Sequence, residues 1–460
     1  MQNTPLERIE AVVKGQKEFF LSGETRKIGF RRDALKKLYS AIVKWEPEIE
    51  SALMADLHKS PEEGYITETG LVLAEIRDHL KHFGRWARRE RRATPLSVFP
   101  SRSYIVKEPL GTALIVSPWN YPVQLLLNPL VGAISAGCTA VLKPSPYVPN
   151  VSSVLEGMLS QTFDENYIAV IQGDREVNAQ LLAQRWDMIF FTGSPSLGRT
   201  VMAAAAKNLT PVVLELGGKS PCIIDRDADL EIAARRCVWG KCLNSGQTCI
   251  APDYLFVHES VKEAFVEAFS RQLRWLYREG LDKDTPHYGH IVRNAAFERV
   301  TGYLKDGEII CGGSYDAESR FLEPTLLYNV APDSPVMTEE IFGPVFPLNT
   351  FRELEEVEKF VVSREKPLAF YYFGNERRGW ELISRTSSGG ACINDTIMHI
   401  ANPNVPFGGV GNSGMGHYHS RLSFDAFTHH RSVLVSPVWP DMPFRYMPYK
   451  FMWIVRKLLR

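Results

Sequence analysis

Hydrophobic residues recur at helical spacing over the first ninety positions, and the pattern changes at Ser103. Leu35, Leu38, Ile42 and Leu53 follow the helical period, which ends in the basic run RWARRERR. Beyond this point, short apolar runs rich in β-branched residues alternate with helical or turn segments. Such runs without alternation are typical of strands covered on both faces, so they predict a parallel sheet between helices. The strand candidates are 113–116, 140–142, 168–171, 188–191, 212–214 and 222–224.

A second α/β series follows Glu215. We expect helices over about 229–243 and up to about 277, with strands at 254–257, 369–373 and 391–394. This series predicts a second α/β domain. Two further segments, 103–108 and 431–436, read as extended chain.

Two apolar stretches raise the question of a membrane. The eighteen uncharged residues 125–142 contain Asn128, Pro129 and two glycines, so a buried helix followed by a strand is favoured over a span. The terminal segment 449–460 mixes Phe451, Trp453 and basic residues, and is too short to span. We favour packing on a partner or covering the substrate entrance over binding a membrane surface.

Composition excludes several classes of function. The 460 residues suggest about two to three domains. Lys plus Arg and Asp plus Glu both number 53, so no overall field attracts nucleic acid. The seven cysteines form no CxxC pair, and MQNTPLERIE lacks a signal-peptide pattern, so we expect a cytoplasmic protein. His417 and His419 lack further ligands, and we expect no metal site.

Three residues are candidates for carbonyl chemistry. Cys249 lies in NSGQTCIAPDY, a loop of small and polar residues that exposes a thiol, although local context leaves packing open. Glu215 ends a buried apolar run, where desolvation raises a carboxyl pKa toward that of a general base. Asn120 follows the strand ending at Val116, where open α/β sheets place ligands, and its amide suits an oxyanion.

A turn between a strand and a helix is the best nucleotide candidate. Gly193 and Gly198 in FFTGSPSLG bracket this turn, and a helix N-terminus attracts pyrophosphate. Lys143 in LKPSP can reach ribose or phosphate. The literal GxGxxG at 409–414 follows no convincing strand, so we interpret it as a glycine-rich turn. Gly218, Lys219 and Ser220 imitate a phosphate loop, but Val213 replaces its first glycine.

The ordered motifs resemble those of the aldehyde dehydrogenase superfamily. They are SPWNYP, LKPS, FTGS, LELGGKSP, GQTC, EEIFGP and PFGG, from Ser117 to Gly409. NSGQTCIAPDY and PFGGVGNSGMGHYHSRLSFDAFTHHRS are similar to the class 3 branch, which includes fatty and aromatic aldehyde dehydrogenases. The resemblance covers about Leu35 to Ser436.

The resemblance implies a role for each matching position. Cys249 is then the nucleophile and Glu215 the general base, while Asn120 and the Cys249 backbone N–H hold the oxyanion. The implied reaction is aldehyde oxidation to a carboxylic acid through a thioester that base-activated water hydrolyses. The cofactor-binding residues are Trp119, Lys143, Gly193, Ser194, Gly198, Leu216, Glu340 and Phe342.

The resemblance also implies a fold, a cofactor and an assembly. We expect a Rossmann-like doubly wound cofactor domain, a second α/β catalytic domain and a small β oligomerisation arm, in a homodimer. Pro146 stands where many NAD-selective relatives carry glutamate, so we expect both NAD and NADP to be used. The expected limits are 1–214 for the NAD(P)-binding domain (100–110 in the arm), 215–418 for the catalytic domain, 419–436 for the arm and 437–460 for the tail.

Substrate and reaction type leave alternatives. Tyr121 and Phe407 are candidates to contact a medium or long aliphatic or aromatic aldehyde, although such residues are also common in cores. One rival passes the acyl group to coenzyme A, which does not need Glu215 as a base. A redox-free cysteine hydrolase leaves the nucleotide turn unexplained, and an idle binding protein on the same fold is the third rival.

Overall fold

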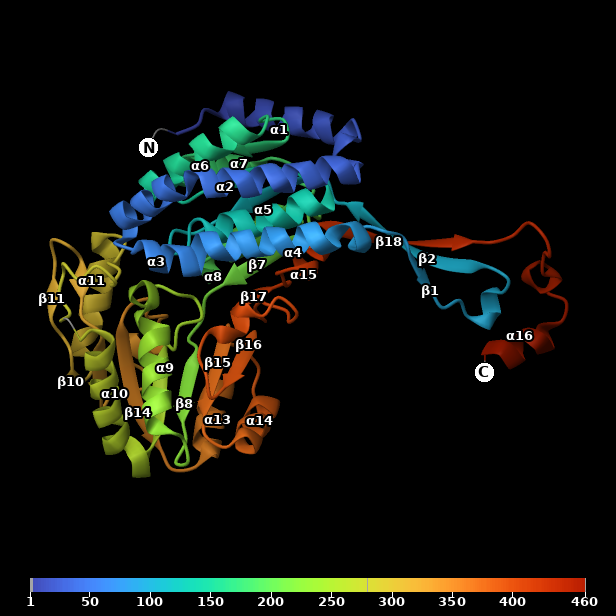
Figure 1. Cartoon of the computed structure of the whole chain (residues 1–460). Coiled ribbons are helices and arrows are strands. Elements are labelled where there is room, and N and C mark those ends of the chain that lie inside the picture. The colour runs from blue at the N-terminus through green and yellow to red at the C-terminus, as the bar shows by residue number, and fades with distance from the viewer. Residues whose placement is uncertain (1–2, 279, 460) are drawn as a thin grey trace.

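The first α/β sheet lies in the upper part of the molecule (Figure 1). The computed structural model describes residues 3–278 and 280–459. The strands of this first sheet run parallel in the order β17-β7-β6-β3-β4-β5, except that β17 is antiparallel to β7. Five of the six expected strands belong to this sheet, and the sixth, 222–224, lies in the second sheet. The bounds of the strands in the first sheet are β3 Thr112–Val116, β4 Thr139–Lys143, β5 Ile168–Val170, β6 Met188–Gly193, β7 Val212–Leu216 and β17 Gly414–Met415.

Helices cover both faces of this sheet because alternate strand residues face opposite ways. Ala113 and Ile115 belong to one core cluster and Leu114 to another. The first face is covered by α2 (Ile28–Leu57), α4 (Gly70–Trp86), α5 (Gln124–Ala136) and α6 (Pro149–Thr162), and the second by α1 (Leu6–Leu21), α7 (Arg175–Ala183) and α8 (Pro195–Ala206). Helix α5 is buried along its whole length and leads into β4, which confirms the expectation for 125–142.

The second sheet has the strand order β10-β13-β14-β9-β8-β15-β16, with β10 antiparallel to β13. Three of its strands, β10, β13 and β14, are missing from the sequence prediction. Two α/β sheets confirm the expected fold class. The bounds are β8 Pro221–Ile224, β9 Tyr254–His258, β10 Glu308–Cys311, β13 Thr325–Tyr328, β14 Val345–Phe351, β15 Ala369–Phe373 and β16 Gly390–Ile393.

Helices pack on this sheet from both sides, and short elements lie in the connections along the chain. One side holds α9 (Leu230–Cys242) and α10 (Lys262–Leu276), and the other holds α11 (Asn294–Gly302), α13 (Leu354–Val362) and α14 (Glu376–Arg385). The shorter elements are η1 Glu24–Arg26, α3 Pro61–Gly64, the π-helix η2 Tyr65–Thr69, η4 Leu243–Gly246, η5 Glu259–Val261, η6 Tyr303–Lys305, β11 Tyr315–Asp316, β12 Phe321–Leu322, α12 Pro335–Thr338, η7 Met398–Ala401 and α15 Arg421–Ala426.

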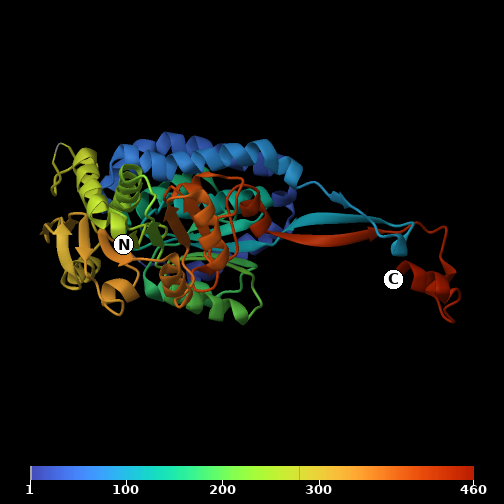
Figure 2. The same ribbon diagram turned by 90° about the horizontal axis from the view of Figure 1, so that it is seen from below.

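A three-stranded antiparallel arm projects from the body (Figures 1 and 2). It contains β1 (Glu90–Arg92), β2 (Arg102–Pro109) and β18 (Thr428–Val435), which confirms the extended segments expected near 103–108 and 431–436. After η8 (Pro443–Arg445), α16 (Met452–Leu459) contacts η3 (Leu96–Val98) at the far end of the arm. The tail therefore does not cover the entrance to a site in the body of its own chain. Among the described helices, none is long and apolar enough to cross a membrane.

Candidate active site

Cys249 lies in a tight loop between α9 and β9, at the junction of the two sheets. Three consecutive residues, Asn244, Ser245 and Gly246, have left-handed backbone with φ of 50°, 52° and 75°. A Cβ at Gly246 would lie 2.4 Å from the Gly343 carbonyl oxygen, so this position has no room for a side chain. The sharp turn brings the half-buried thiol out of the core.

Side-chain amides fix this loop. The Gln247 amide nitrogen donates to the carbonyl oxygens of Asn244 and His290 at 3.1 and 3.0 Å, and its amide oxygen accepts from the Val292 N–H at 3.0 Å. Beyond the cysteine, the Tyr371 hydroxyl donates to the Ile250 carbonyl at 2.5 Å. The backbone on both sides of Cys249 is therefore held by buried hydrogen bonds.

The resting Cys249 side chain is a thiol. Burial raises its pKa to about 12, and the nearby carboxylates of Glu340 and Glu215 add to this shift. The backbone N–H groups of Cys249 and Ile250 act in the opposite direction because they stabilise the thiolate. Reactivity therefore requires that the proton leave as the sulfur attacks, or that positive charge arrive nearby.

Glu215 lies in β7, deep in the same junction. It is 3% exposed, and neither carboxyl oxygen has a hydrogen-bond partner among the described residues. Burial raises the pKa of Glu215 well above the usual value, because desolvation favours the neutral form of the carboxyl group. A Cβ at Gly408 would lie 3.2 Å from Oε1, so the 407–409 segment passes close to this carboxyl group.

Asn120 and Tyr121 come from the turn between β3 and α5, and both contact the cysteine loop. The Asn120 amide nitrogen donates to the Gln247 carbonyl at 2.9 Å, two residues before Cys249. The Tyr121 hydroxyl shares a 2.5 Å hydrogen bond with the Thr248 hydroxyl. The structure thus brings three parts of the chain together around the thiol.

The loop containing Glu340 and Phe342 lies on the other side of the cysteine. The Gly218 N–H donates to Glu340 at 3.0 Å, and the Phe342 ring meets Trp119 edge-on at 5.4 Å. Burial raises the pKa of Glu340 to about 7, and Asp253 contributes to this rise.

Two residues that the sequence did not identify anchor this loop. Lys219 donates to the carbonyls of Val336 and Glu339 at 2.8 and 2.7 Å and also pairs with Asp253. Asp253 in turn accepts from the Ile341 N–H at 3.0 Å. Lys219 stood out in the sequence only as an imitation of a phosphate loop, and Asp253 gave no signal.

A cleft runs between the two sheets. It consists of cavities of about 720 and 250 Å³ that both touch Pro195 and Asn412. Ser194 caps α8 through the Leu197 N–H at 3.4 Å, and a Cβ at Gly198 would meet the Leu216 side chain at 2.6 Å. Glycine at this helix start keeps the helix close to β7.

Polar groups also lie at the ends of β3, β4 and β6, outside the lining of these two cavities. The hydroxyls of Ser117 and Thr192 are buried without hydrogen-bond partners among the described residues. Lys143 is buried, and its ammonium donates to the Pro144 carbonyl at 2.8 Å. Burial lowers the pKa of Lys143 to about 8. Buried hydroxyls and a lysine at this edge are the donors that ribose and phosphate oxygens require. Gly193, at the end of β6, completes this edge.

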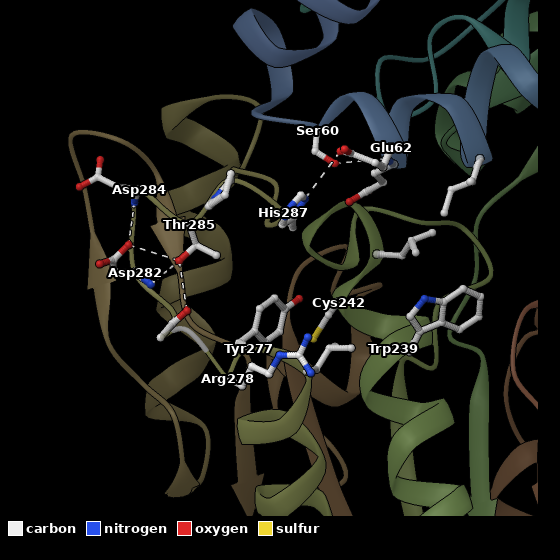
Figure 3. A pocket seen from close by; sticks show the side chains of 16 residues that line it. Ser60, Glu62, Trp239, Cys242, Tyr277, Arg278, Asp282, Asp284, Thr285 and His287 are labelled. Carbon is white, nitrogen blue, oxygen red and sulfur yellow. Dashed lines mark hydrogen bonds and ion pairs between the residues drawn. The ribbon is translucent and has the colours of Figure 1, made fainter.

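A separate cavity of about 650 Å³ lies between α3, α9 and the chain after α10 (Figure 3). Trp239, Leu243 and Tyr277 line it together with acidic and basic side chains. Neither of the expected substrate-binding residues, Tyr121 and Phe407, lines this cavity. Tyr121 is buried against Thr248, and Phe407 stacks edge-on against Tyr418 at 5.7 Å.

Two sequence interpretations concern the chain around β17. The glycine-rich stretch 409–414 forms a tight turn closed by a bridge between Gly411 and Gly414, which confirms its interpretation as a turn. Among the described residues, no group of three His, Cys, Asp or Glu side chains is placed to hold a metal ion.

Comparisons with known proteins agree on one family. A family model described as the aldehyde dehydrogenase family matches residues 1–433. The 4,4'-diaponeurosporen-aldehyde dehydrogenase of Staphylococcus aureus is 45% identical over 96% of this chain and 97% of its own. The dimeric NADP-preferring aldehyde dehydrogenase of Rattus norvegicus is 45% identical over 93% and 94%. The solved structure described as the substrate-bound state of Staphylococcus aureus AldH has a TM-score of 0.96 at 44% identity, covering 98% and 99%.

Proposed function

Because this chain belongs to the aldehyde dehydrogenase family and is an NAD(P)-dependent enzyme that oxidises aldehydes to acids, we propose roles for three of its residues. Cys249 is the nucleophile, Glu215 is the base of the hydrolytic half-reaction, and Asn120 is a donor to the oxyanion. One observation carries the proposal: a thiol, a buried unpaired carboxyl group and an amide meet at one junction. Burying a carboxyl group without hydrogen-bond partners destabilises the fold, so its presence at this position indicates a role in the reaction.

In the first half-reaction, a bond forms between the Cys249 sulfur and the aldehyde carbon as the thiol releases its proton to solvent water. The aldehyde oxygen becomes anionic and accepts from the Asn120 amide and the Cys249 backbone N–H. A bound NAD or NADP, held by Lys143, Ser194 and Glu340, would supply the acceptor for the hydride that leaves the former aldehyde carbon. The product on the protein is a thioester at Cys249.

In the second half-reaction, Glu215 in its ionised form takes a proton from water as the water oxygen attacks the thioester carbon. The bond between carbon and sulfur then breaks, the carboxylic acid leaves, and Glu215 passes the proton that it took from water to the Cys249 sulfur. Coenzyme A transfer is disfavoured because a thiol acceptor does not need this base. A redox-free hydrolase is disfavoured because it leaves the dinucleotide cleft unused.

We assign the cofactor to the cleft between the sheets. Ser194 and the start of α8 face the pyrophosphate, Lys143 the ribose or phosphate, and Glu340 the nicotinamide ribose. Pro146 supplies no carboxylate to repel a 2′-phosphate, so we expect both NAD and NADP to be used. Steady-state kinetics that showed a preference above roughly a thousandfold, about 4 kcal/mol, would contradict this assignment. The remaining cofactor contacts come from Trp119, Gly193, Gly198, Leu216 and Phe342.

The substrate class that we propose is medium or long aliphatic or aromatic aldehydes. Tyr121 and Phe407, which flank the junction, are the expected apolar contacts. The printed name of the Staphylococcus aureus relative, a 4,4'-diaponeurosporen-aldehyde dehydrogenase, supports an aldehyde of this apolar kind. The tail at the end of the arm is assigned to packing rather than to a membrane surface.

We also propose that the protein forms a homodimer and that it resides in the cytoplasm, a reducing compartment. The rat relative is called dimeric, and the arm of this chain offers strands for a second subunit. All seven cysteines are free thiols, which suits a reducing environment.

One assay tests the proposed chemistry. Absorbance of reduced nicotinamide is followed with decanal or benzaldehyde, with and without coenzyme A, for the wild type and Cys249→Ala. We expect aldehyde-dependent reduction without coenzyme A in the wild type and none in the variant. Reduction that required coenzyme A, or ester hydrolysis alone, would favour one of the rival reactions.

A further inference from the structure

A fully buried ion pair lies behind the turn that carries Asn120. Lys59 precedes α3, Glu68 lies in the π-helix η2, and both side chains are 0% exposed. Their charged atoms are 2.6 Å apart. Burying two charges removes their hydration, and this desolvation cost can exceed the attraction between them. An ion pair at this depth therefore indicates a structural or functional role.

The Lys59 ammonium group contacts the turn that carries Asn120. Besides Glu68, it donates to the backbone carbonyl of Asn120 at 3.1 Å and lies 4.3 Å from the centre of the Tyr121 ring. The same Asn120 carbonyl accepts from the Asn244 side chain at 2.7 Å. Both lone pairs of this carbonyl are therefore used, which fixes the orientation of the peptide.

Glu68 holds the other end of the turn. Its second oxygen accepts from the N–H groups of Val123 and Gln124 at 2.8 and 3.1 Å. Helix α5 begins at Gln124 and has no side-chain cap at its own N-cap residue, so Glu68 supplies that cap from another element. The π-helix, an irregular turn often found at functional sites, places the carboxylate there.

The same short segment also reaches the cysteine loop. Glu63 of α3 accepts from the Asn244 N–H at 2.7 Å, and Asn244 also donates to the Gln247 carbonyl at 3.2 Å. That carbonyl accepts one of the two hydrogens of the Asn120 amide nitrogen. With the backbone and one amide hydrogen fixed, the direction of the second hydrogen is fixed as well.

We propose that Lys59 and Glu68 are positioning residues that hold the Asn120 amide in register with the Cys249 backbone N–H, so that both donate to the same oxyanion. The ion pair acts through Asn120 and does not touch the substrate. This inference rests on the proposed role of Asn120, and it assigns a task to two charges outside the reacting groups.

A double-mutant cycle tests the inference. The single-turnover rate of aldehyde-dependent nicotinamide reduction is measured for the wild type, Lys59→Met, Asn120→Ala and the double variant. Lys59→Met is expected to slow this rate about tenfold to a hundredfold, because a displaced oxyanion donor loses most of its effect. In the Asn120→Ala background, Lys59→Met is expected to change the rate less than about twofold.

Further readouts separate positioning from a loss of structure. The alkylation rate of Cys249 by iodoacetamide and the KM for the cofactor are expected to stay within about twofold of wild type, because neither depends on the oxyanion. Lys107→Met is the matched control, since Lys107 is also buried, pairs with Asp425 at 3.4 Å and lies over the Phe424 ring. It is expected to leave the single-turnover rate unchanged.

The outcomes that overturn the inference are distinct from failure of the proposed function. Additive losses in the cycle, a wild-type rate in Lys59→Met, or an equal loss in Lys107→Met would each overturn it. Should Lys59→Met fail to fold, Glu68→Gln, which keeps the size of the side chain, replaces it in the same cycle. Nicotinamide reduction that survived in Cys249→Ala would instead refute the proposed function, before the cycle is considered.

Discussion

Two acidic groups, Cys249 and Glu215, lie in one junction, and burial favours the protonated form of both. The pKa of the Cys249 thiol is raised to about 12 by burial and by nearby carboxylates, and burial also raises that of Glu215. Each group, once ionised, opposes ionisation of the other. Burial thus favours the protonated form of both residues, and each must lose its proton at a different stage of the proposed reaction.

Glu215 makes the stability of the protein depend on pH. Its pKa is higher in the folded than in the unfolded chain, so the unfolded chain releases this proton first as pH rises. The wild type is expected to lose stability relative to Glu215→Gln above about pH 4.3, by at most about 1.4 kcal/mol per pH unit, up to the folded pKa. Urea unfolding of both proteins from about pH 5 to about pH 8 measures this difference. A constant difference would contradict it.

The same shift predicts the pH dependence of hydrolysis. Glu215 acts as a base only when ionised, so the rate of thioester hydrolysis should rise with pH, and over a higher pH range than an ordinary glutamate would give. Glu215→Gln is expected to lower this rate about a hundredfold to ten-thousandfold and to flatten the profile. Steady-state kcat against pH, checked for rate-limiting hydrolysis by a burst, measures it. A variant that kept the wild-type slope would assign the base elsewhere.

At the scale of elements, the 339–344 loop is held against the cysteine loop by Lys219 and Asp253. Glu340 and Phe342 depend on this support for their positions. Asp253→Asn is expected to raise the KM for the cofactor about tenfold, because a loosened loop must be ordered on binding. Initial rates at varied cofactor concentration measure this change.

Asp225→Asn is the matched control for that experiment. Asp225 is also buried and paired, with Arg378 at 2.8 Å, but it lies at the opposite end of the second sheet. Its replacement should leave the cofactor KM unchanged. Equal KM effects of the two substitutions would argue against a specific role for the 339–344 loop.

The sequence predicts elements well where one segment carries its own pattern. Strands β3, β4, β6 and β7 are short apolar runs, and all appear within a residue or two of the expected limits. Strand β14 was missed because Pro347 interrupts its pattern, and proline normally argues against a central strand. The neighbouring strands β10 and β13 are too short to give a clear period.

The residues of the candidate site also differ in whether the sequence alone could identify them. Cys249, Glu215 and Asn120 could be named because each has a local context and the motifs occur in a family order. Lys59 and Glu68 could not, because a Lys and a Glu in a helical stretch normally face solvent. Only the fold shows that both are buried behind Asn120.

At the scale of the whole molecule, the arm projects from the body (Figure 2), and exposed apolar side chains lie near its far end. Leu434 and Val438 are 52% and 95% exposed at this end. Most residues of β18 are exposed although the strand is fully paired with β2. A projecting sheet with exposed apolar residues is better explained by a second subunit than by solvent.

Substitutions in the arm test this assembly. Replacing Leu434 and Val438 with Asp is expected to shift the mass from dimer toward monomer in sedimentation equilibrium. Leu209→Asp, on an equally exposed leucine of the body, should leave the mass unchanged. A wild type that is monomeric at all concentrations would contradict the proposed dimer.

The central claim is that Cys249 carries an acyl group between oxidation and hydrolysis, and intact-protein mass spectrometry of Glu215→Gln tests it most directly. After mixing with excess aldehyde and NADP, the protein should gain the mass of the aldehyde less two hydrogens. One equivalent of reduced nicotinamide should form per subunit, and Cys249→Ala should show neither change. Absence of the adduct despite formation of reduced nicotinamide, or an adduct that persists in Cys249→Ala, would contradict the account.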